Sequence, residues 1–246
     1  MSERKMLLDA RDITKRYGGL VAVDNVSIHL MEGEILGLIG ANGAGKTTFF
    51  NMISGVQTMT AGEIYFEGKL IKNPKSHEMC KLGIGRTYQI CQPFSNLTVL
   101  ENTMVGAFMK NSNAAMARKE AEAVLEMVGM SALKNTVGKD LSLPQLKRME
   151  VARALATKPK VLLLDEVMAG LNPAECEKVM QMVLDIRDSG ISIIMIEHIM
   201  KAIMNVSDRI YVLNQGKKIA EGTPLEVSQN PEVIKSYLGE SRHARH

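Results

Sequence analysis

The stretch Gly40-Ala41-Asn42-Gly43-Ala44-Gly45-Lys46-Thr47-Thr48 matches the phosphate-binding loop pattern G-x-x-x-x-G-K-[ST]. The apolar run before it, residues 35–39, predicts a buried strand, and residues 48–55 predict a short helix that ends at Gly55. A glycine-rich turn between a strand and a helix presents backbone N–H groups and the positive end of the helix dipole to a phosphate. We therefore expect this chain to bind a nucleoside triphosphate.

Each residue type in this loop has its own expected task. Gly40, Gly43 and Gly45 allow the sharp backbone turns that point N–H groups at an anion. Lys46 is expected to reach the β- and γ-phosphates of ATP, and the Thr47 hydroxyl to bind Mg²⁺. A glycine-rich turn followed by a surface lysine is the competing interpretation, and it leaves the flanking strand and helix unexplained. The predicted nucleotide contacts in the loop are Gly40, Asn42, Gly43, Ala44, Gly45, Lys46, Thr47 and Thr48.

The composition is that of an ordinary globular protein. Of the 246 residues, 46% are hydrophobic and 23% charged. The net charge of +3 and the aromatic content of 4% provide neither a basic surface nor a stacking platform, so nucleic acid is not expected as a partner. Cys80, Cys91 and Cys176 have no metal-ligand spacing and, without a secretory signal, are expected to be reduced thiols. No stretch approaches the ~20 apolar residues of a membrane span, so other subunits would have to cross a membrane.

Strand-like segments on both sides of the loop predict a small antiparallel sheet. Residues 7–17 and 21–30 are joined by a glycine turn, and residues 63–67 alternate polar and apolar side chains. A short helix is expected over residues 74–82, because its first residue is a proline, which suits the first turn of a helix. Residues 86–100 show no regular pattern.

The second half of the chain alternates strands with helices, which predicts a parallel sheet covered on both faces. Residues 161–164, 191–196 and 210–213 are apolar except for Ser192, as in strands that are buried on both sides. Between the first two, Asn172-Pro173 predicts the start of a helix that Gly190 ends.

Residues 114–128 are strong helix formers, so we expect residues 91–157 to be mostly helical and to form a separate lobe. The chain is then one α/β domain over residues 1–246, with a P-loop NTPase core and a mixed, mainly parallel sheet. The nucleotide-binding core, including the small antiparallel β subdomain, would comprise residues 1–90 and 158–246.

Two carboxylates and a histidine follow predicted strands of this sheet. Asp165-Glu166 ends the run at 161–164, and His198 comes just after the run at 193–196. Ligands of such sheets bind at the carboxyl ends of the strands. We expect Asp165 to hold Mg²⁺ opposite Thr47, Glu166 to act on the water that attacks the γ-phosphate, and His198 to contact that phosphate or that water. The competing interpretations are an acidic turn and a structural histidine.

In order and spacing, the 40–48 loop, Gln89, Asp165-Glu166 and His198 resemble the ATP-binding subunits of ABC transporters. The resemblance covers nearly the whole chain. Longer stretches look like one branch of the family, the ATPases of branched-chain amino acid importers. These stretches are Tyr17-Gly18-Gly19-Leu20-Val21-Ala22-Val23, Arg86-Thr87-Tyr88-Gln89, Ala169-Gly170-Leu171-Asn172-Pro173, Ser207-Asp208-Arg209-Ile210-Tyr211 and Tyr237-Leu238-Gly239-Glu240.

The resemblance assigns further roles. Tyr17 would stack on adenine, and Gln89 would touch Mg²⁺ and the attacking water and link the nucleotide to the helical lobe. Members of the family work as dimers with two ATP molecules between the subunits, each held by the loop of one subunit and the signature segment of the other. Here that segment is Leu141-Ser142-Leu143-Pro144-Gln145, without the two usual glycines. Ser142 and Gln145 form a predicted capping box that opens a helix toward the second subunit's ATP.

The resemblance implies an ATPase subunit on the cytoplasmic face of the membrane that powers amino acid import. Its partners would be an identical or related ATPase subunit, membrane permease subunits and, indirectly, a substrate-binding protein. A helix of the permease would dock in a groove lined in part by Pro93, Phe94 and Leu97. Three alternatives stay open: a lipopolysaccharide-export ATPase, a degenerate subunit with weak hydrolysis beside a competent partner, and a soluble ABC ATPase of DNA repair or translation.

Overall fold

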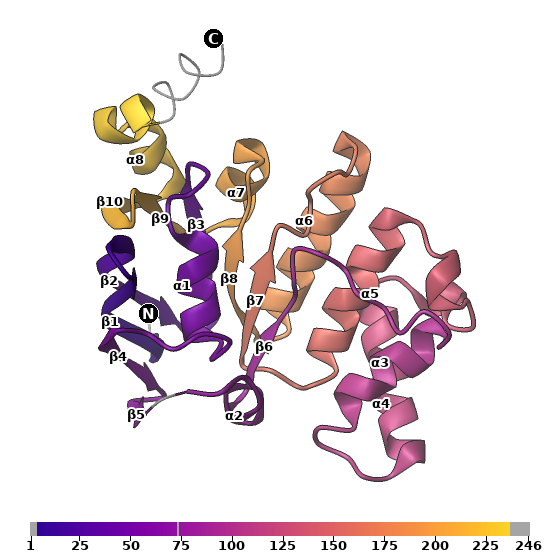
Figure 1. Cartoon of the computed structure of the whole chain (residues 1–246). Coiled ribbons are helices and arrows are strands. Elements are labelled where there is room, and N and C mark those ends of the chain that lie inside the picture. The colour runs from indigo at the N-terminus through magenta and orange to yellow at the C-terminus, as the bar shows by residue number, and fades with distance from the viewer. Residues whose placement is uncertain (1–3, 73, 237–246) are drawn as a thin grey trace.

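The computed structural model describes residues 4–72 and 74–236 and contains two sheets flanked by helices (Figure 1). The strands are β1 Met6–Tyr17, β2 Leu20–Met31, β3 Ile35–Gly40, β4 Ala61–Phe66, β5 Lys69–Ile71, β6 Ile84–Arg86, β7 Val161–Asp165, β8 Ser192–Ile196, β9 Arg209–Asn214 and β10 Lys217–Gly222. The helices are α1 Lys46–Ile53, α2 Ser76–Leu82, α3 Val99–Ala107, α4 Ala114–Met127, α5 Leu143–Leu155, α6 Pro173–Asp188, α7 Met200–Val206 and α8 Pro224–Gln229. Within the described ranges, no helix combines the length and the apolarity of a membrane span.

The larger sheet has six strands in the order β10-β9-β3-β8-β7-β6. All its pairings are parallel except that of β10 with β9. Every residue of β3, β7 and β8 is buried, as their largely apolar sequences predict. The prediction of a mixed, mainly parallel sheet is confirmed, and the carboxyl ends of β3, β7 and β8 meet at one edge.

The central strands separate two hydrophobic cores. On β7, Leu162 and Leu164 belong to the core that contains α6 and α7, whereas Val161 and Leu163 belong to the core that contains α1. This division follows from the two-residue period of a strand. The second core is closed by the antiparallel sheet, whose order β2-β1-β4-β5 confirms the predicted small subdomain.

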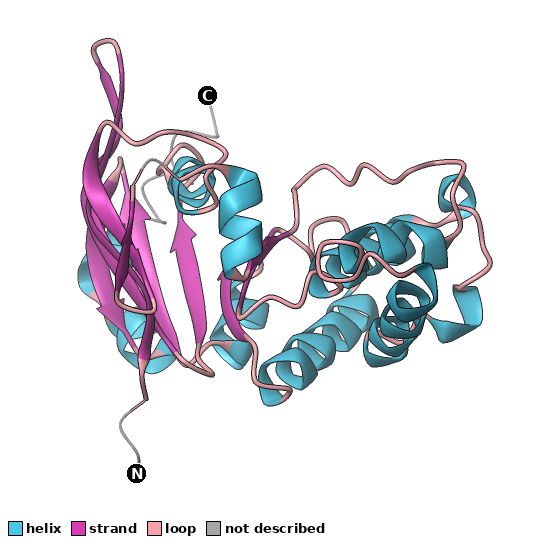
Figure 2. Cartoon of the chain, turned by 90° about the horizontal axis from the view of Figure 1, so that it is seen from below, coloured by secondary structure: helices cyan, strands magenta, loops and turns pink. Residues whose placement is uncertain are grey.

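Helices α3, α4 and α5, called the helical lobe below, lie beside the sheets (Figure 2). Helix α4 confirms the predicted helix over 114–128. Helix α3 approaches α5 so closely that a Cβ on Gly106 would lie 2.2 Å from the carbonyl oxygen of Arg153, and only glycine fits there.

Several short elements differ from the sequence prediction. Helix α2 begins at Ser76 after Lys75 as N-cap, so the expected start at Pro74 is wrong. Helix α3 begins within the segment predicted to be irregular, where Thr98 caps it by accepting the Glu101 N–H. Strand β6 and helices α7 and α8 were not predicted, because three to seven residues are too few to show a period. The quoted stretch 237–240 lies outside the described residues.

Candidate nucleotide-binding site

The loop between β3 and α1 has the glycine-dependent shape that its motif predicts. Gly40, Gly43 and Gly45 have φ angles of 152°, 78° and 99°, which residues with a Cβ rarely adopt. A Cβ on Gly40 would lie 2.2 Å from the Leu213 carbonyl oxygen, and one on Gly45 would lie 2.5 Å from that of Ala22. Strands β9 and β2 therefore lie so close to this loop that only glycine fits at positions 40 and 45.

Lys46 is the first residue of α1, earlier than the predicted start at Thr48. Its ammonium lies over the loop, where Nζ donates to the carbonyl oxygens of Gly40 at 2.6 Å and Ala41 at 2.9 Å. A cavity of about 250 Å³ opens beside it. The loop and residues that follow β7 and β8 thus line the same cavity. The lining residues are Ala22, Asn42, Gly43, Ala44, Gly45, Lys46, Thr47, Thr48, Gln89, Glu166 and His198.

Glu166 is held from two sides at this cavity. Its Oε1 lies 2.5 Å from Nε2 of His198, and its Oε2 accepts a hydrogen bond from Nε2 of Gln89 at 2.8 Å. An ionised carboxylate only accepts, so the geometry places the His198 proton on Nε2. The backbone of Glu166 has φ of 51°, a left-handed conformation that is uncommon for a residue with a Cβ. Such conformations cluster at functional sites, where the surroundings hold them in place.

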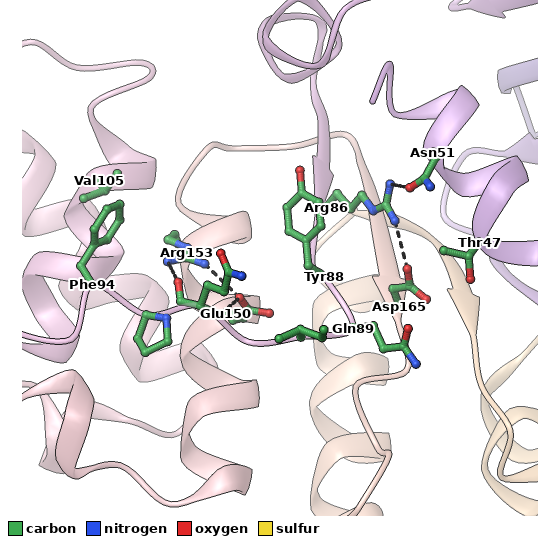
Figure 3. A pocket seen from close by; sticks show the side chains of 13 residues that line it. Thr47, Asn51, Arg86, Tyr88, Gln89, Phe94, Val105, Glu150, Arg153 and Asp165 are labelled. Atoms are coloured by element: carbon green, nitrogen blue, oxygen red, sulfur yellow. Dashed lines mark hydrogen bonds and ion pairs between the residues drawn. The ribbon is translucent and has the colours of Figure 1, made fainter. Parts of the chain in front are cut away.

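Asp165 is almost completely buried, at 1% exposure, next to a second and larger cavity of about 720 Å³ (Figure 3). Its Oδ2 receives Arg86 Nη2 at 3.0 Å, and its backbone N–H donates to Thr87 Oγ1 at 3.1 Å. Burial raises the pKa of Asp165, and the Arg86 guanidinium opposes that rise. Its other oxygen, Oδ1, has no hydrogen-bond partner among the described residues. Asp165, Thr47 and Gln89 all line this cavity, so oxygen ligands for a hard cation converge there.

The signature segment opens helix α5, as predicted. Ser142 is the N-cap residue, and Gln145 Oε1 accepts its N–H at 2.9 Å. Pro144 lies in the first turn, where backbone N–H groups have no helical partner. Neither Ser142 nor Gln145 lines the loop cavity of its own chain.

Comparison with known proteins identifies the family. The model of the ABC transporter family matches residues 23–169, more than half of the chain. This chain belongs to the ABC transporter ATPases. A second model, the branched-chain amino acid ATP-binding cassette transporter, matches residues 217–243 of this ABC ATPase. Family members hydrolyse ATP to power transport.

Individual proteins that are similar to this ABC ATPase are also ATP-binding proteins of transport systems. It is 38% identical to the high-affinity branched-chain amino acid transport ATP-binding protein LivG of Salmonella typhimurium, over 96% of this chain and 98% of LivG. It is 36% identical to the lipopolysaccharide export system ATP-binding protein LptB of Escherichia coli, over 95% of this chain and 97% of LptB. Both predictions, the family and its branch, are thereby confirmed as resemblances in sequence.

Solved structures of ABC cassettes match the fold. The ADP conformation of MJ1267, an ATP-binding cassette of an ABC transporter, superposes with a TM-score of 0.87 at 33% identity, over 95% of this chain and 99% of that one. A dimeric post-hydrolysis state of the cassette MJ0796, bound to ADP and phosphate, matches with a TM-score of 0.80 at 27% identity, over 89% and 99%. Cassettes of this fold therefore bind nucleotide and form dimers.

Two buried cations of this ABC ATPase were missed as site residues. Arg86 connects Asp165 to α1, because its Nη1 donates to Asn51 Oδ1 at 2.7 Å. Lys147 on α5 is 6% exposed, and its Nζ donates to the backbone carbonyl of Glu166 at 2.7 Å. The sequence does carry a signal for Lys147, which lies four residues before the buried Val151 on one helix face.

A third carboxylate, Glu197, lies just before His198 and was also missed. It is 2% exposed, and its Oε1 accepts the backbone N–H of Met168 at 2.8 Å. Burial raises its pKa to about 7, partly offset by that N–H and by the charge of Lys147. The turn after Glu166 is thus fixed to the end of β8.

Tyr17 does not line the loop cavity. It ends β1 as an exposed residue, with 45% of its surface accessible. The Lys15 ammonium lies 5.1 Å from its ring centroid, and its hydroxyl accepts a hydrogen bond from the side-chain amide of Gln57. An exposed ring leaves a face for a purine to stack on. The described chain therefore brings the loop, Gln89, Glu166 and His198 together, and leaves Tyr17 outside that group.

Proposed function

We propose that this ABC ATPase binds ATP on the 40–48 loop and hydrolyses it between two closed cassettes. It thereby powers import of branched-chain amino acids through separate membrane subunits, from the cytoplasmic face of the membrane. The observation that carries the hydrolytic part is the Glu166 carboxylate, held by Gln89 and His198 in the cavity beside the loop. The cargo rests on the family model at residues 217–243 and on the name of LivG.

The loop residues supply most of the binding. Backbone N–H groups of the loop and the N-terminus of α1 face the β- and γ-phosphates, and the Lys46 ammonium lies within the same cavity to neutralise them. Tyr17 stacks on adenine with its exposed ring face. Glu166 accepts a proton from water while the water oxygen attacks the γ-phosphorus, and the bond from that phosphorus to the bridging oxygen of ADP breaks.

Mg²⁺ fits the residues at the second cavity. Thr47, Gln89 and the unpartnered Oδ1 of Asp165 are oxygen donors that line the same space. They would hold the ion together with phosphate oxygens, directly or through water. When bound, the ion neutralises the charge that develops on the transferred phosphoryl group.

Gln89 and His198 orient Glu166. Each contacts one carboxylate oxygen, at 2.8 Å and 2.5 Å, and the remaining lone pairs of those oxygens can accept the attacking water. His198 lies beside that water and can also contact the γ-phosphate. Gln89 leads into residues 90–94, so a movement of that segment would change the hold on Glu166. Transport and hydrolysis are linked at this point.

The groove for a permease helix is the end of the 720 Å³ cavity that Phe94 and Val105 line, opposite Thr47 and Asp165 (Figure 3). Pro93 and Phe94 line it, together with the ion pair of Arg153 and Glu150 at 3.0 Å. Leu97 is not among the lining residues of this cavity, and its contact with a permease helix stays a prediction. The chain turns after Phe94, whose carbonyl accepts the Leu97 N–H at 3.0 Å, and Leu97 lies in that turn.

The two-cassette arrangement is supported by the dimeric MJ0796 structure and by the position of the signature segment. Ser142 and Gln145 lie away from their own loop cavity at the exposed start of α5. There they can close on the ATP of a second cassette, identical or related, and the helix dipole adds to the attraction.

Two other functions compete. Lipopolysaccharide export has a relative at 36% identity in LptB, but the model at residues 217–243 favours amino acid transport. A degenerate subunit is suggested by the two missing glycines of the signature. The close hold on Glu166 by Gln89 and His198 favours an active one.

The test is ATP turnover by the purified protein and by Glu166→Gln, with dimerisation on ATP followed by light scattering. The proposal expects turnover in the unaltered protein, and only a small residual turnover with stable ATP-bound dimers in the variant. Dimers without turnover in the unaltered protein would show a degenerate subunit. For the cargo, uptake of radiolabelled leucine is measured in cells with the wild-type chain or Glu166→Gln. Equal uptake in both would contradict amino acid import.

A further inference from the structure

We propose that Lys147 is a positioning residue for Glu166, which holds the backbone of that carboxylate in its left-handed conformation and ties it to the helix that meets the second cassette's nucleotide. The inference rests on the proposed catalytic role of Glu166. It is carried by the buried hydrogen bond from Lys147 Nζ to the Glu166 carbonyl oxygen at 2.7 Å.

The backbone of Glu166 is held at both of its polar groups. Its N–H donates to the carbonyl oxygen of Ile196 at the end of β8, at 3.0 Å. Its carbonyl oxygen accepts Lys147 Nζ at 2.7 Å and the Ala169 N–H at 3.3 Å. The bond from Lys147 is the shorter of the two and comes from a charged donor, so it is the stronger. A φ of 51° at a residue with a Cβ persists only where such contacts fix it.

Stability does not account for a lysine at this position. Lys147 is 6% exposed, and its ammonium takes part in none of the ion pairs within 4 Å found in the described part of the chain; its charge acts at longer range on Glu197, whose pKa it lowers. Burial of an ammonium group is unfavourable unless close partners compensate for the lost water. A methionine would fill the same space without that cost, at the loss of this longer-range attraction. The lysine therefore fits a role at the carbonyl of Glu166 better than a role in packing.

The position of Lys147 also connects two catalytic sites. It lies on α5, which begins directly after Ser142, the residue proposed to meet the ATP of the second cassette. Lys147 is the fifth residue after Ser142, about 7.5 Å farther along the helix axis. When α5 shifts as the cassettes close, the ammonium shifts with it. Closure around one ATP molecule is thereby transmitted to the carboxylate that acts on the other.

The experiment compares Lys147→Met, Lys147→Gln and Lys147→Arg with the control Lys119→Met, which makes the same change at an exposed position of α4. For each variant we measure kcat, affinity for a fluorescent ATP analogue and the midpoint of thermal unfolding. We expect Lys147→Met and Lys147→Gln to lower kcat by about 10- to 100-fold, as small displacements of reacting groups do. ATP affinity should change less than twofold, and the melting temperature of Lys147→Met should stay equal or rise. Lys147→Arg should recover a large part of kcat, and Lys119→Met should match the wild type.

A double variant shows whether Lys147 acts through Glu166. In the Glu166→Gln background, Lys147→Met should cause no further loss of residual turnover. An additional 10-fold loss there would overturn the inference, as would an unchanged kcat in Lys147→Met. A lower melting temperature together with lost ATP binding in both neutral variants would show a structural role and overturn it as well. Wild-type turnover by Glu166→Gln alone would instead refute the proposed function, and the inference with it.

Discussion

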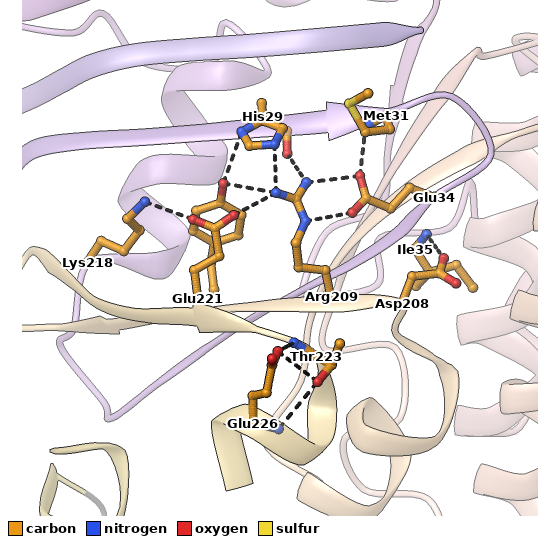
Figure 4. Close-up of polar contacts among 11 residues, drawn as sticks. His29, Met31, Glu34, Ile35, Asp208, Arg209, Lys218, Glu221, Thr223 and Glu226 are labelled. Carbon is orange, nitrogen blue, oxygen red and sulfur yellow. Dashed lines mark hydrogen bonds and ion pairs between the residues drawn. The ribbon is translucent and has the colours of Figure 1, made fainter. Parts of the chain in front are cut away.

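Arg209 and Glu34 form a two-point ion pair in which Nε meets Oε1 at 2.8 Å and Nη2 meets Oε2 at 3.1 Å (Figure 4). Arg209 begins β9 of the central sheet, and its Nη2 also donates to the carbonyl of His29 on β2 at 2.9 Å. Its Nη1 lies 2.6 Å from Oε1 of Glu221 on β10. One guanidinium thus joins the larger, six-stranded sheet to the antiparallel sheet that closes the second core.

Replacing Arg209 should destabilise the whole fold. Arg209→Met would leave the 4%-exposed Glu34 without its partner, and an unpaired buried charge costs about 3–5 kcal/mol of unfolding free energy. Arg209→Lys should lie in between, because an ammonium cannot make the two-point contact. Urea unfolding measures both. Arg118→Met, which removes an exposed arginine from a 3.8 Å pair on α4, should leave the midpoint unchanged. An equal shift of the unfolding midpoint in Arg209→Met and Arg118→Met would contradict the role of the ion pair.

The sequence predicts the parts of this protein that depend on local pattern. The loop at 40–48, the buried strands and the capping box at Ser142 all follow from residue type and spacing, and the structure has them. Arg86 and Lys147 escaped prediction as site residues because their partners, Asp165 and Glu166, are remote in sequence. Only the tertiary fold brings such a cation next to a carboxylate or a carbonyl.

The role of Tyr17 is one that neither the sequence pattern nor the fold of a single chain can establish. Family resemblance assigns it to adenine, but within one chain its ring lies outside the loop cavity, next to Lys15 and Gln57. A stacking contact is formed by the ligand itself, so neither residue spacing nor the fold of the protein alone places it. The same holds for Ser142 and Gln145, whose proposed ligand is bound by a second subunit.

Substitution of Gly40 should remove nucleotide binding. In Gly40→Ala the new Cβ would lie 2.2 Å from the Leu213 carbonyl oxygen, at a φ of 152°. That oxygen belongs to β9, which pairs with β3 and cannot move away. We expect at least a 10-fold loss of affinity for a fluorescent ATP analogue, because the loop N–H groups lose their orientation. Gly19→Ala is the control, since a Cβ there has no atom within 4 Å. Wild-type affinity in Gly40→Ala would show that the loop tolerates the displacement.

Glu197 should make stability depend on pH. Its folded-state pKa is raised to about 7 by burial, from 4.5, so the folded protein binds the proton more tightly than the unfolded chain. Stability therefore falls as the pH rises from about 4.5 to 7, by a few kcal/mol from this group alone. Above pH 7 the loss is complete. Urea unfolding of Glu197→Gln should lack this slope, whereas Glu177→Gln at an exposed position of α6 should keep it. An unchanged slope in Glu197→Gln would assign the dependence to other groups.

The signature segment should limit the rate of hydrolysis. Pro144 has no N–H, so the start of α5 offers the second cassette's phosphate one donor fewer than a glycine at this position would. Removing one donor from a developing oxyanion costs about 10²–10³ in rate, and Pro144→Gly should restore part of it, raising kcat by at least tenfold. Its stability should fall slightly, because glycine loses more conformational freedom on folding. Pro224→Gly makes the same change in the first turn of α8 and should lower stability without raising kcat. The measurement is kcat at saturating ATP for Pro144→Gly and for Pro224→Gly. An unchanged kcat in Pro144→Gly, with folding and ATP affinity retained, would mean that the missing N–H does not face the reacting phosphate.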